Sequence, residues 1–563
     1  MVLSTQTGKA RTGGQILVDQ LLLHGVRDIF CVPGESYLAV LDALHDAEVR
    51  VTVCRQEAGA SMAAEAAGKL TGQPGICMVT RGPGATNAAH GIHVAMQDST
   101  PLIMFVGQIE TGMREREAFQ ELDYRAAFGG LAKWVTEIDD PARIPELLSR
   151  AFHVATSGRP GPVVIALPED MLVALATVPD APAFRPMDTH PGLTQMAELQ
   201  KRLWAAKRPF VLVGGSRWSE TAVQRLIRFA ERFDLPVAPT FRRQSLFPAT
   251  HPNYAGDAGL GISAKLAQSI KDADLVLCIG DRLSEASTIS YTLFDIPGDG
   301  QKLIHVHPDA SELNRVYACN LPINASPEAF TASLEGLQPP NTIDWRDWTG
   351  AINTNAVAWG AQPTRSPGDL QMSDVMIWLR NRLPKDAIIT NGAGNYAIWI
   401  HRFYHFTQYN TQLSPTSGSM GYGVPAAVAA KRLKPETMVI SFAGDGCFLM
   451  NGQEFATAVQ YDLPIIVVVV DNGMYGTIRM HQEREYPGRV SSTALKNPDF
   501  SAYARAFGGH GETVRKTEEF ATAFERCIAS GMPSIIHCFV DSEAITPSKT
   551  LTDIRKEAVA QGK

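Results

Sequence analysis

The sequence lacks the features that would place the chain in a membrane, outside the cell or on nucleic acid. Its eight cysteines are scattered singly without a CxxC pair, so neither a zinc site nor a disulfide framework is predicted. The most apolar run, PIIVVVV at 464–470, is far too short to cross a bilayer. The N-terminal stretch MVLSTQTGKARTGGQ has no apolar segment of the kind found in signal peptides. The 51 basic and 58 acidic residues give no electrostatic reason for a nucleic-acid partner. We therefore expect a cytoplasmic protein with no membrane or nucleic-acid partner.

Short β-branched runs alternate with helix-like stretches along nearly the whole chain, which is typical of α/β domains with parallel sheets and crossover helices. The clearest predicted strands lie at 75–80, 162–167, 209–214, 275–280, 437–442 and 464–470. Two segments, 176–192 and 338–369, are rich in proline or poorly periodic, and we predict them to be linkers. Because 563 residues are too many for one core, the linkers are expected to separate three units.

A carboxylate stands where an early predicted strand ends. The apolar run at 29–32 is broken by Pro33 and Gly34, and Glu35 follows directly. Ligands gather at strand ends in open parallel sheets, so Glu35 is a candidate catalytic residue. A carboxylate at the start of the next helix is the commoner explanation.

The stretch FAGDGCF at 442–448 contains the most informative pattern. One predicted strand ends at Gly444, Asp445 and Gly446, and the next strand along the chain ends at Asp471 and Asn472. A βαβ crossover would bring Asp445 and Asn472 to the same sheet edge. A carboxylate and an amide oxygen suit Mg²⁺, and the glycines and the following helix start favour a phosphate. A tight turn, with Asp445 capping the helix, is the alternative for GDG alone.

The spacing from GDG to this asparagine resembles the cofactor motif of thiamine diphosphate-dependent enzymes. The resemblance implies that Asp445, Asn472 and the backbone carbonyl of Met474 bind Mg²⁺. Met420, in SPTSGSMGYG, resembles the bulky residue beneath the cofactor that enforces its bent conformation, although a core methionine is the alternative. The other implied cofactor-binding residues of this unit are Gly394, Asn395, Gly418, Gly446, Cys447 and Gly476.

A thiamine enzyme also needs a carboxyl group that hydrogen-bonds the aminopyrimidine ring and so helps to remove the proton from thiazolium C2. Glu57 precedes an alanine-rich helix, and GPGATN follows at 82–87. Taken alone, Glu57 could be a helix N-terminal carboxylate. In this context it resembles the family's catalytic glutamate, and the resemblance implies that Gly34, Pro83 and Asn87 bind the cofactor.

The resemblance spans nearly the whole chain and is nearest to acetolactate (acetohydroxyacid) synthases. EAFQELD at 117–123 matches that branch, in which Phe119 and Gln120 would face the reacting carbons. The family implies three doubly wound parallel-sheet α/β domains: pyrimidine-binding at 1–180, central and Rossmann-like at 190–340, and diphosphate-binding at 365–550. Because its active site forms between two chains, a homodimer or homotetramer is implied.

Three positions depart from the synthase pattern. Glu35 stands where the synthases carry glycine, and the decarboxylase branch has there an aspartate that assists proton transfer. His481 stands where synthases carry a tryptophan linked to larger acceptors; as a candidate catalytic residue it competes with a surface role. The central unit has GDRLSEAST at 280–288 in place of the flavin-adjacent segment, and LVGGSRWSE lacks GxGxxG, so FAD is only a candidate cofactor.

The sequence therefore predicts an enzyme that uses thiamine diphosphate and Mg²⁺ on a 2-oxo acid or related carbonyl substrate. Glu57 would activate the cofactor, Gln120 would orient the adduct or acceptor, and Glu35 would shuttle a proton. Decarboxylation with carboligation is the leading hypothesis, and a non-carboligating decarboxylase or 2-hydroxyacyl lyase is the alternative. A non-catalytic regulatory homologue is a remote alternative, since it would have no need of Glu57.

Overall fold

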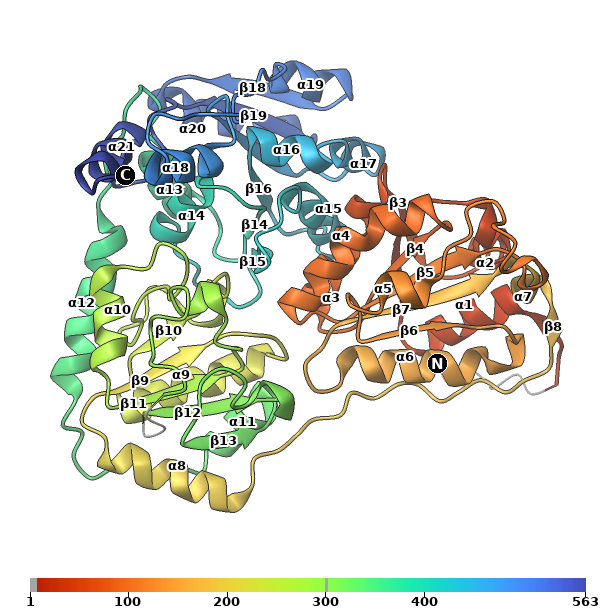
Figure 1. The fold of residues 1–563 in the computed structure, drawn as a ribbon, viewed down its shortest axis with the longest axis horizontal. Coiled ribbons are helices and arrows are strands. Elements are labelled where there is room, and N and C mark those ends of the chain that lie inside the picture. The colour runs from red at the N-terminus through yellow and green to blue at the C-terminus, as the bar shows by residue number, and fades with distance from the viewer. Residues whose placement is uncertain (1–7, 299–301) are drawn as a thin grey trace. The chain divides into compact units, whose positions relative to one another are not determined.

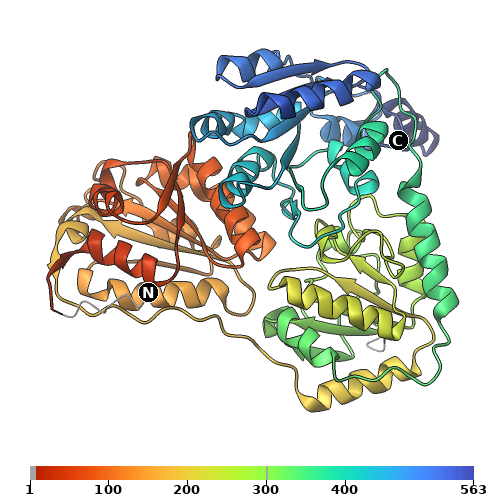
Figure 2. The same ribbon diagram turned by 180° about the vertical axis from the view of Figure 1, so that it is seen from behind.

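The computed structural model describes residues 8–298 and 302–563. The chain divides into two compact units, one up to Met187 together with Val428–Leu433, and one made of Asp188–Ala427 and Lys434–Lys563. Each larger sheet is parallel throughout, and the second unit contains two of them (Figures 1 and 2). These sheets confirm the predicted α/β fold class. The three-domain boundaries stay a proposal.

The first unit is built on a six-stranded sheet in the order β3-β2-β4-β5-β7-β6. Alternate strand residues such as Ile76 and Met78 pack on α1, α2, α6 and α7, while α3 and α4 contact β4 and β5. The strands are β2 (Asp28–Cys31), β3 (Arg50–Val53), β4 (Gly75–Val79), β5 (Leu102–Gln108), β6 (Trp134–Glu137) and β7 (Pro162–Pro168), with a small antiparallel pair, β1 (Arg11–Thr12) and β8 (Leu175–Ala176). The helices are α1 (Gly13–Leu23), α2 (Leu38–His45), α3 (Glu57–Thr71), α4 (Pro83–Asp98), α5 (Tyr124–Phe128), α6 (Ile144–Thr156) and α7 (Glu169–Val173).

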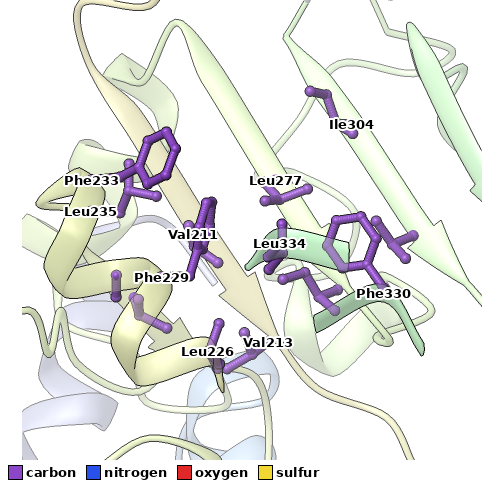
Figure 3. Packing of buried hydrophobic residues seen from close by; sticks show 14 of the residues in the cluster. Val211, Val213, Leu226, Phe229, Phe233, Leu235, Leu277, Ile304, Phe330 and Leu334 are labelled. Carbon is purple, nitrogen blue, oxygen red and sulfur yellow. The ribbon is translucent and has the colours of Figure 1, made fainter. Parts of the chain in front are cut away.

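The second unit begins with a five-stranded sheet in the order β10-β9-β11-β12-β13. Both faces are buried: Val211 and Val213 pack against Leu226 and Phe229 (Figure 3), whereas Phe210 and its alternate neighbours join a second apolar cluster. The elements are β9 (Pro209–Val213), β10 (Val237–Pro239), β11 (Leu275–Ile279), β12 (Leu303–His307), β13 (Leu321–Asn324), α8 (Leu193–Ala205), α9 (Glu220–Phe233), α10 (Ala264–Asp272) and α11 (Pro327–Leu334).

The third large sheet has six strands in the order β15-β14-β16-β17-β19-β18. Its strands are β14 (Ile388–Asn391), β15 (Gln412–Leu413), β16 (Val439–Gly444), β17 (Ile466–Asp471), β18 (His510–Val514) and β19 (Ser534–Phe539). Its helices are α13 (Met372–Arg382), α14 (Tyr396–Phe403), α15 (Gly423–Leu433), α16 (Asp445–Asn451), α17 (Glu454–Gln460), α18 (Gly476–Glu485), α19 (Phe500–Ala506), α20 (Thr517–Ser530) and α21 (Leu551–Ala560). All six strands predicted from the sequence are therefore present.

One predicted linker is wrong in part. Residues 177–192 are irregular as expected, but the segment 338–369 contains a helix, α12 (Arg346–Ala361). Only a narrow stripe of α12, including Ile352, is buried, and this explains its weak apolar periodicity. The indole of Trp345 anchors its start by donating to the carbonyls of Phe233 and Asp234 at 2.9 and 3.0 Å.

In the part of the chain that the structure describes, no helix is both long and apolar enough to span a bilayer.

Three buried or half-buried histidines are expected to make the protein sensitive to mild acid. Burial lowers the pKa of His307 and of His405 to about 4 and that of His401 to about 3. Between these values and about 6.5, the unfolded chain binds protons that the folded chain does not, so stability present above about pH 6.5 is lost as the pH falls. We expect the free energy of unfolding to fall by about 1 kcal/mol for each such histidine when the pH is lowered from about 7.5 to about 5.5.

Urea unfolding of His307→Gln should show a smaller loss over this pH interval than the unsubstituted protein. The matched control is His190→Gln, because His190 is exposed in an irregular segment. An equal pH dependence in all three proteins would contradict the prediction.

Candidate cofactor and active site

A cavity of about 250 Å³ lies at the carboxyl edge of the third sheet. There β14 and β16 are neighbours. The chain continues from β14 to β15 at one edge of the sheet and from β16 to β17 in the opposite direction along the strand order. Such a switch point is where open parallel sheets bind ligands. The structure brings together here every residue of the third unit that the sequence predicted to bind cofactor or metal. They are Gly394, Asn395, Gly418, Met420, Asp445, Gly446, Cys447, Asn472, Met474 and Gly476.

The candidate metal ligands follow two neighbouring parallel strands. Gly444 at the end of β16 pairs with Val470 near the end of β17, so Asp445 and Asn472 emerge at the same edge. Asp445 Oδ2 accepts a hydrogen bond from Asn497 Nδ2 at 2.7 Å. Asn472 Oδ1 accepts from the backbone N–H of Met474 at 3.3 Å, which folds this turn toward the cavity.

The electrostatics at this edge favour a cation. Burial, together with the neighbouring charge of Asp471, raises the pKa of Asp445 to about 6 against the effect of the Asn497 hydrogen bond. Burial also acts to raise the pKa of Asp471, but the hydrogen bond from His537 at 2.9 Å and others outweigh it and leave that pKa below its usual value. Asn497 Oδ1 is buried without a hydrogen-bond partner among the described residues. The cavity is therefore lined by a carboxylate, Asp445, and an amide, Asn472, whose oxygens are ligand types that suit a hard divalent cation.

Three residues of the cavity wall, Gly476, Asn395 and Cys447, are closely packed. A Cβ on Gly476 would lie 2.8 Å from the Asn472 amide nitrogen, so glycine at this position lets the Asn472 side chain pack close to the start of α18. The Asn395 side chain accepts from the Thr477 hydroxyl at 2.9 Å and donates to the carbonyl of Ile545 at 3.1 Å. The Cys447 sulfur accepts from a backbone N–H at 3.3 Å. Both side chains therefore brace the cavity wall.

In the first unit, Glu57 is the first residue of α3, and the Gln56 side chain caps the helix by accepting from two backbone N–H groups. Glu57 Oε2 accepts a hydrogen bond from Asn87 Nδ2 at 3.0 Å. Glu57 is half-buried, whereas Pro83 and Asn87, on the first turns of α4, are exposed. The structure thus places Glu57 and Asn87 within hydrogen-bond distance of each other, next to exposed positions of this unit.

Glu35 lies at the switch point of the first sheet, where β2 and β4 are neighbours. It begins a single 3-10 turn, Glu35–Tyr37, so the helix-start explanation also holds. Its Oε1 accepts from Arg81 Nη2 at 2.8 Å, and the other terminal nitrogen of Arg81 binds Glu169. Sequence reasoning missed Arg81; its signal is a cation placed directly after a buried strand, beside the GPGATN glycines.

Phe119 and Gln120 lie in the loop after β5, beside the same arginine. The Arg81 guanidinium lies 5.9 Å from the Phe119 ring centre, and Phe119 is 73% exposed. Gln120 has a φ of +65°, and a Cβ on Gly82 would lie 2.7 Å from its carbonyl oxygen. Gly34 packs against Thr80, leaving no room for a side chain. The first-unit candidates therefore gather along one sheet edge.

The remaining candidate residue, His481, lies apart from the cavity. It is exposed on α18, and its ring nitrogen lies 3.5 Å from the guanidinium of Arg484. It does not line the cavity, and a catalytic role for it stays a prediction.

The central sheet, the part of the chain for which FAD was a candidate cofactor, has closely packed strand ends. Its switch point lies between β9 and β11, and a Cβ on Gly215 would collide with the carbonyl of Gly280. The Asp281 carboxylate accepts from the Thr240 hydroxyl and from the backbone of Leu283. Strand packing alone accounts for these glycines, and their polar neighbours already bind each other. FAD therefore stays a candidate cofactor, and we derive no step through it.

Comparison with known proteins identifies all three sheets. Residues 11–127, 196–334 and 392–538 match the N-terminal thiamine pyrophosphate (TPP) binding, central and C-terminal TPP binding domains of thiamine pyrophosphate enzymes. The chain is 30% identical to the acetolactate synthase isozyme 2 large subunit of Escherichia coli K12, over 94% of this chain and 95% of that protein. It is 32% identical to the acetolactate synthase large subunit of Corynebacterium glutamicum, over 95% of this chain and 87% of that protein.

Proposed function

Because the chain belongs to the thiamine diphosphate-dependent enzymes, and within them to the acetolactate synthase-like proteins, we propose that it decarboxylates a 2-oxo acid and joins the remaining fragment to an acceptor carbonyl. The observation that carries this proposal is the cavity of the third sheet. All the cofactor and metal candidates of that unit line it, and Glu57 of the first unit, the proposed activating carboxyl, accepts a hydrogen bond from Asn87.

When bound, thiamine diphosphate supplies a nucleophilic carbon and holds the electron pair left when carbon dioxide departs. We propose that Asp445, Asn472 and the Met474 carbonyl hold Mg²⁺ for the diphosphate, with Met420 supporting the rings. The Glu57 carboxyl would hold and move a proton at the pyrimidine nitrogen, while Asn87 fixes its other oxygen. These roles are supported by the shared cavity lining and by the Glu57–Asn87 hydrogen bond.

We propose a homodimer or homotetramer in which a second chain covers the exposed edge of the first unit. A proton-sharing glutamate works best in a dry pocket, because burial raises a carboxyl pKa toward that of its partner. Pro83 and Asn87 are exposed beside Glu57, and Phe119 is 73% exposed. The domain assignment follows the sheets: pyrimidine-binding at 1–180, central at 190–340 and diphosphate-binding at 365–550.

A panel of 2-oxo acids, including pyruvate, supplied with Mg²⁺ and thiamine diphosphate tests the proposal. We expect 2-hydroxy-3-oxo acids such as acetolactate as the main products. Release of free aldehyde alone would favour the second candidate, a non-carboligating decarboxylase or lyase, for which the acidic Glu35 at the first switch point is the supporting observation. Formation of neither product would overturn both.

A further inference from the structure

A side-chain amide joins the two strand ends that carry the proposed metal ligands. Asn497 Nδ2 donates to Asp445 Oδ2 at 2.7 Å and to Asp471 Oδ1 at 2.8 Å. Asp445 follows β16 and Asp471 ends β17, whereas Asn497 lies in the loop before α19, later in the chain than both strands. Asn497 does not itself line the cavity. A single nitrogen thus links two buried carboxylates without belonging to the proposed ligand set.

The Asp471 carboxylate also holds the turn that carries the other two proposed ligands. Its Oδ1 accepts from the backbone N–H of Gly473 at 2.9 Å, inside the turn that contains Asn472 and Met474. Gly473 has a φ of +68°, a conformation that favours glycine. The loop before α19 binds the same turn, because the N–H of Leu495 donates to the carbonyl of Gly473 at 2.8 Å. The turn is therefore held both by its own strand end and by this later loop.

A buried histidine connects Asp471 with the loop that carries Asn497. His537 lies on β19, beside β17, and is only 1% exposed. Its Nδ1 accepts from the backbone N–H of Phe500 at 3.2 Å, so its Nε2 carries the proton and donates to Asp471 Oδ2 at 2.9 Å. Because Phe500 follows Asn497 by three residues, these bonds form a closed network of Asn497, Asp471 and His537 across three segments.

We propose that Asn497 is a positioning residue that, together with Asp471 and His537, holds the three oxygens of the proposed Mg²⁺ site at the spacing which this ion requires. This inference rests on the proposed function. Mg²⁺ demands nearly ideal octahedral geometry, whereas the larger Ca²⁺ accepts longer and less regular coordination. A network that fixes the ligands therefore favours Mg²⁺ over Ca²⁺, and loosening it reduces this preference.

The first test measures hydrogen exchange in the cofactor-free protein and so depends on neither metal binding nor catalysis. The backbone N–H groups of residues 473–475 are all hydrogen-bonded in or to the turn, and mass spectrometry follows their exchange. We expect Asn497→Ala to speed this exchange by at least about tenfold, because it removes a hydrogen bond to the charged carboxylate that holds the turn. Unchanged exchange in this variant would overturn the proposal.

The matched control is Asn353→Ala. The Asn353 side chain is half-buried like that of Asn497, and its amide nitrogen also bridges two acceptors, the carbonyls of His251 and Tyr254 at 3.1 and 2.9 Å. This bridge belongs to α12 and not to the proposed metal site. The control should leave exchange at 473–475 unchanged, and an equal rise there would overturn the proposal by showing that any lost amide bridge loosens the turn.

The second test compares two ions by calorimetric titration of Mg²⁺ or Ca²⁺ into protein supplied with thiamine diphosphate. Asn497→Ala should weaken Mg²⁺ binding by about 10–100-fold, the usual effect of removing a partner of a metal ligand. Ca²⁺ binding should weaken by a smaller factor, so that the ratio of the two affinities falls at least about threefold. Equal weakening of both ions, or unchanged Mg²⁺ affinity, would make Asn497 a purely structural residue and overturn the proposal.

A pair of substitutions at His537 tests the network from its other end and keeps the test decisive if Asn497→Ala does not fold. The amide of His537→Gln can still donate to Asp471 and accept from the N–H of Phe500, whereas His537→Leu can do neither. We expect the leucine variant to lose the preference for Mg²⁺ and the glutamine variant to keep most of it. Equal losses in both would overturn the role given to His537.

The two tests also separate this inference from the proposed function. If the unsubstituted protein bound neither ion in the presence of thiamine diphosphate, the proposed function would be overturned. The exchange measurement would still decide whether Asn497 fixes the turn, because it uses the protein without cofactor or metal.

Discussion

Glu57→Gln is expected to lower turnover by a factor of about 10²–10⁴, the range of a general acid–base contribution, while leaving cofactor binding nearly unchanged. The glutamine amide keeps the size of the side chain and can still hydrogen-bond Asn87, which now donates to Glu57 Oε2 at 3.0 Å. It cannot hold and release a proton near neutral pH. The variant therefore separates proton transfer from folding and binding.

The matched control for this variant is Glu220→Gln. Glu220, like Glu57, is the first residue of a capped helix, but it belongs to α9 of the central sheet. Steady-state assays and calorimetric titration with thiamine diphosphate and Mg²⁺ should show normal behaviour for this control. Near-normal turnover of Glu57→Gln would refute the assignment of Glu57. An equal loss in Glu220→Gln would show that the effect comes from the helix start and not from the chemistry.

Asp445→Ala is expected to weaken binding of Mg²⁺ and thiamine diphosphate together by at least about 100-fold. The substitution removes the only carboxylate among the three proposed metal ligands and leaves the Asn497 amide without one of its two acceptors. Because ligand binding stabilises the folded state, the rise in melting temperature on adding cofactor and metal should also disappear. Calorimetry and thermal unfolding with and without the ligands measure both effects.

Two further variants test whether the loss of binding comes from the missing charge of Asp445. Asp445→Asn preserves the shape of the side chain and should still lose most metal affinity, which separates lost charge from a created cavity. Asp386→Ala removes an exposed carboxylate between α13 and β14 that does not line the cavity, and this variant should bind normally. Unchanged binding by Asp445→Ala would contradict the proposed metal site.

The parts of this fold that the sequence predicts well are those set by local patterns. Apolar runs such as 464–470 fix buried strands, and the rule that crossover connections place successive strands side by side predicted that Asp445 and Asn472 share an edge. The residues around the cavity could be predicted because their types and spacing match a family motif.

Other features depend on contacts between distant segments, which no local pattern reveals. The binding of Arg81 to Glu35 and Glu169 requires the order of strands in the sheet, and the bridge from Asn497 to Asp445 and Asp471 requires the fold of a later loop. Helix α12 was missed because so little of its surface is buried that its apolar residues follow no clear period. The close approach of Gly215 to the carbonyl of Gly280, at two strand ends of the central sheet, is another such contact.

The most direct test of the central claim is the exchange rate of the thiazolium C2 proton of thiamine diphosphate bound to the protein, followed by NMR in deuterated water. The account predicts exchange much faster than in free thiamine diphosphate, and a return toward the free rate in Glu57→Gln with the cofactor still bound. Exchange no faster than that of the free cofactor would contradict it, because the chain would then bind the cofactor without activating it.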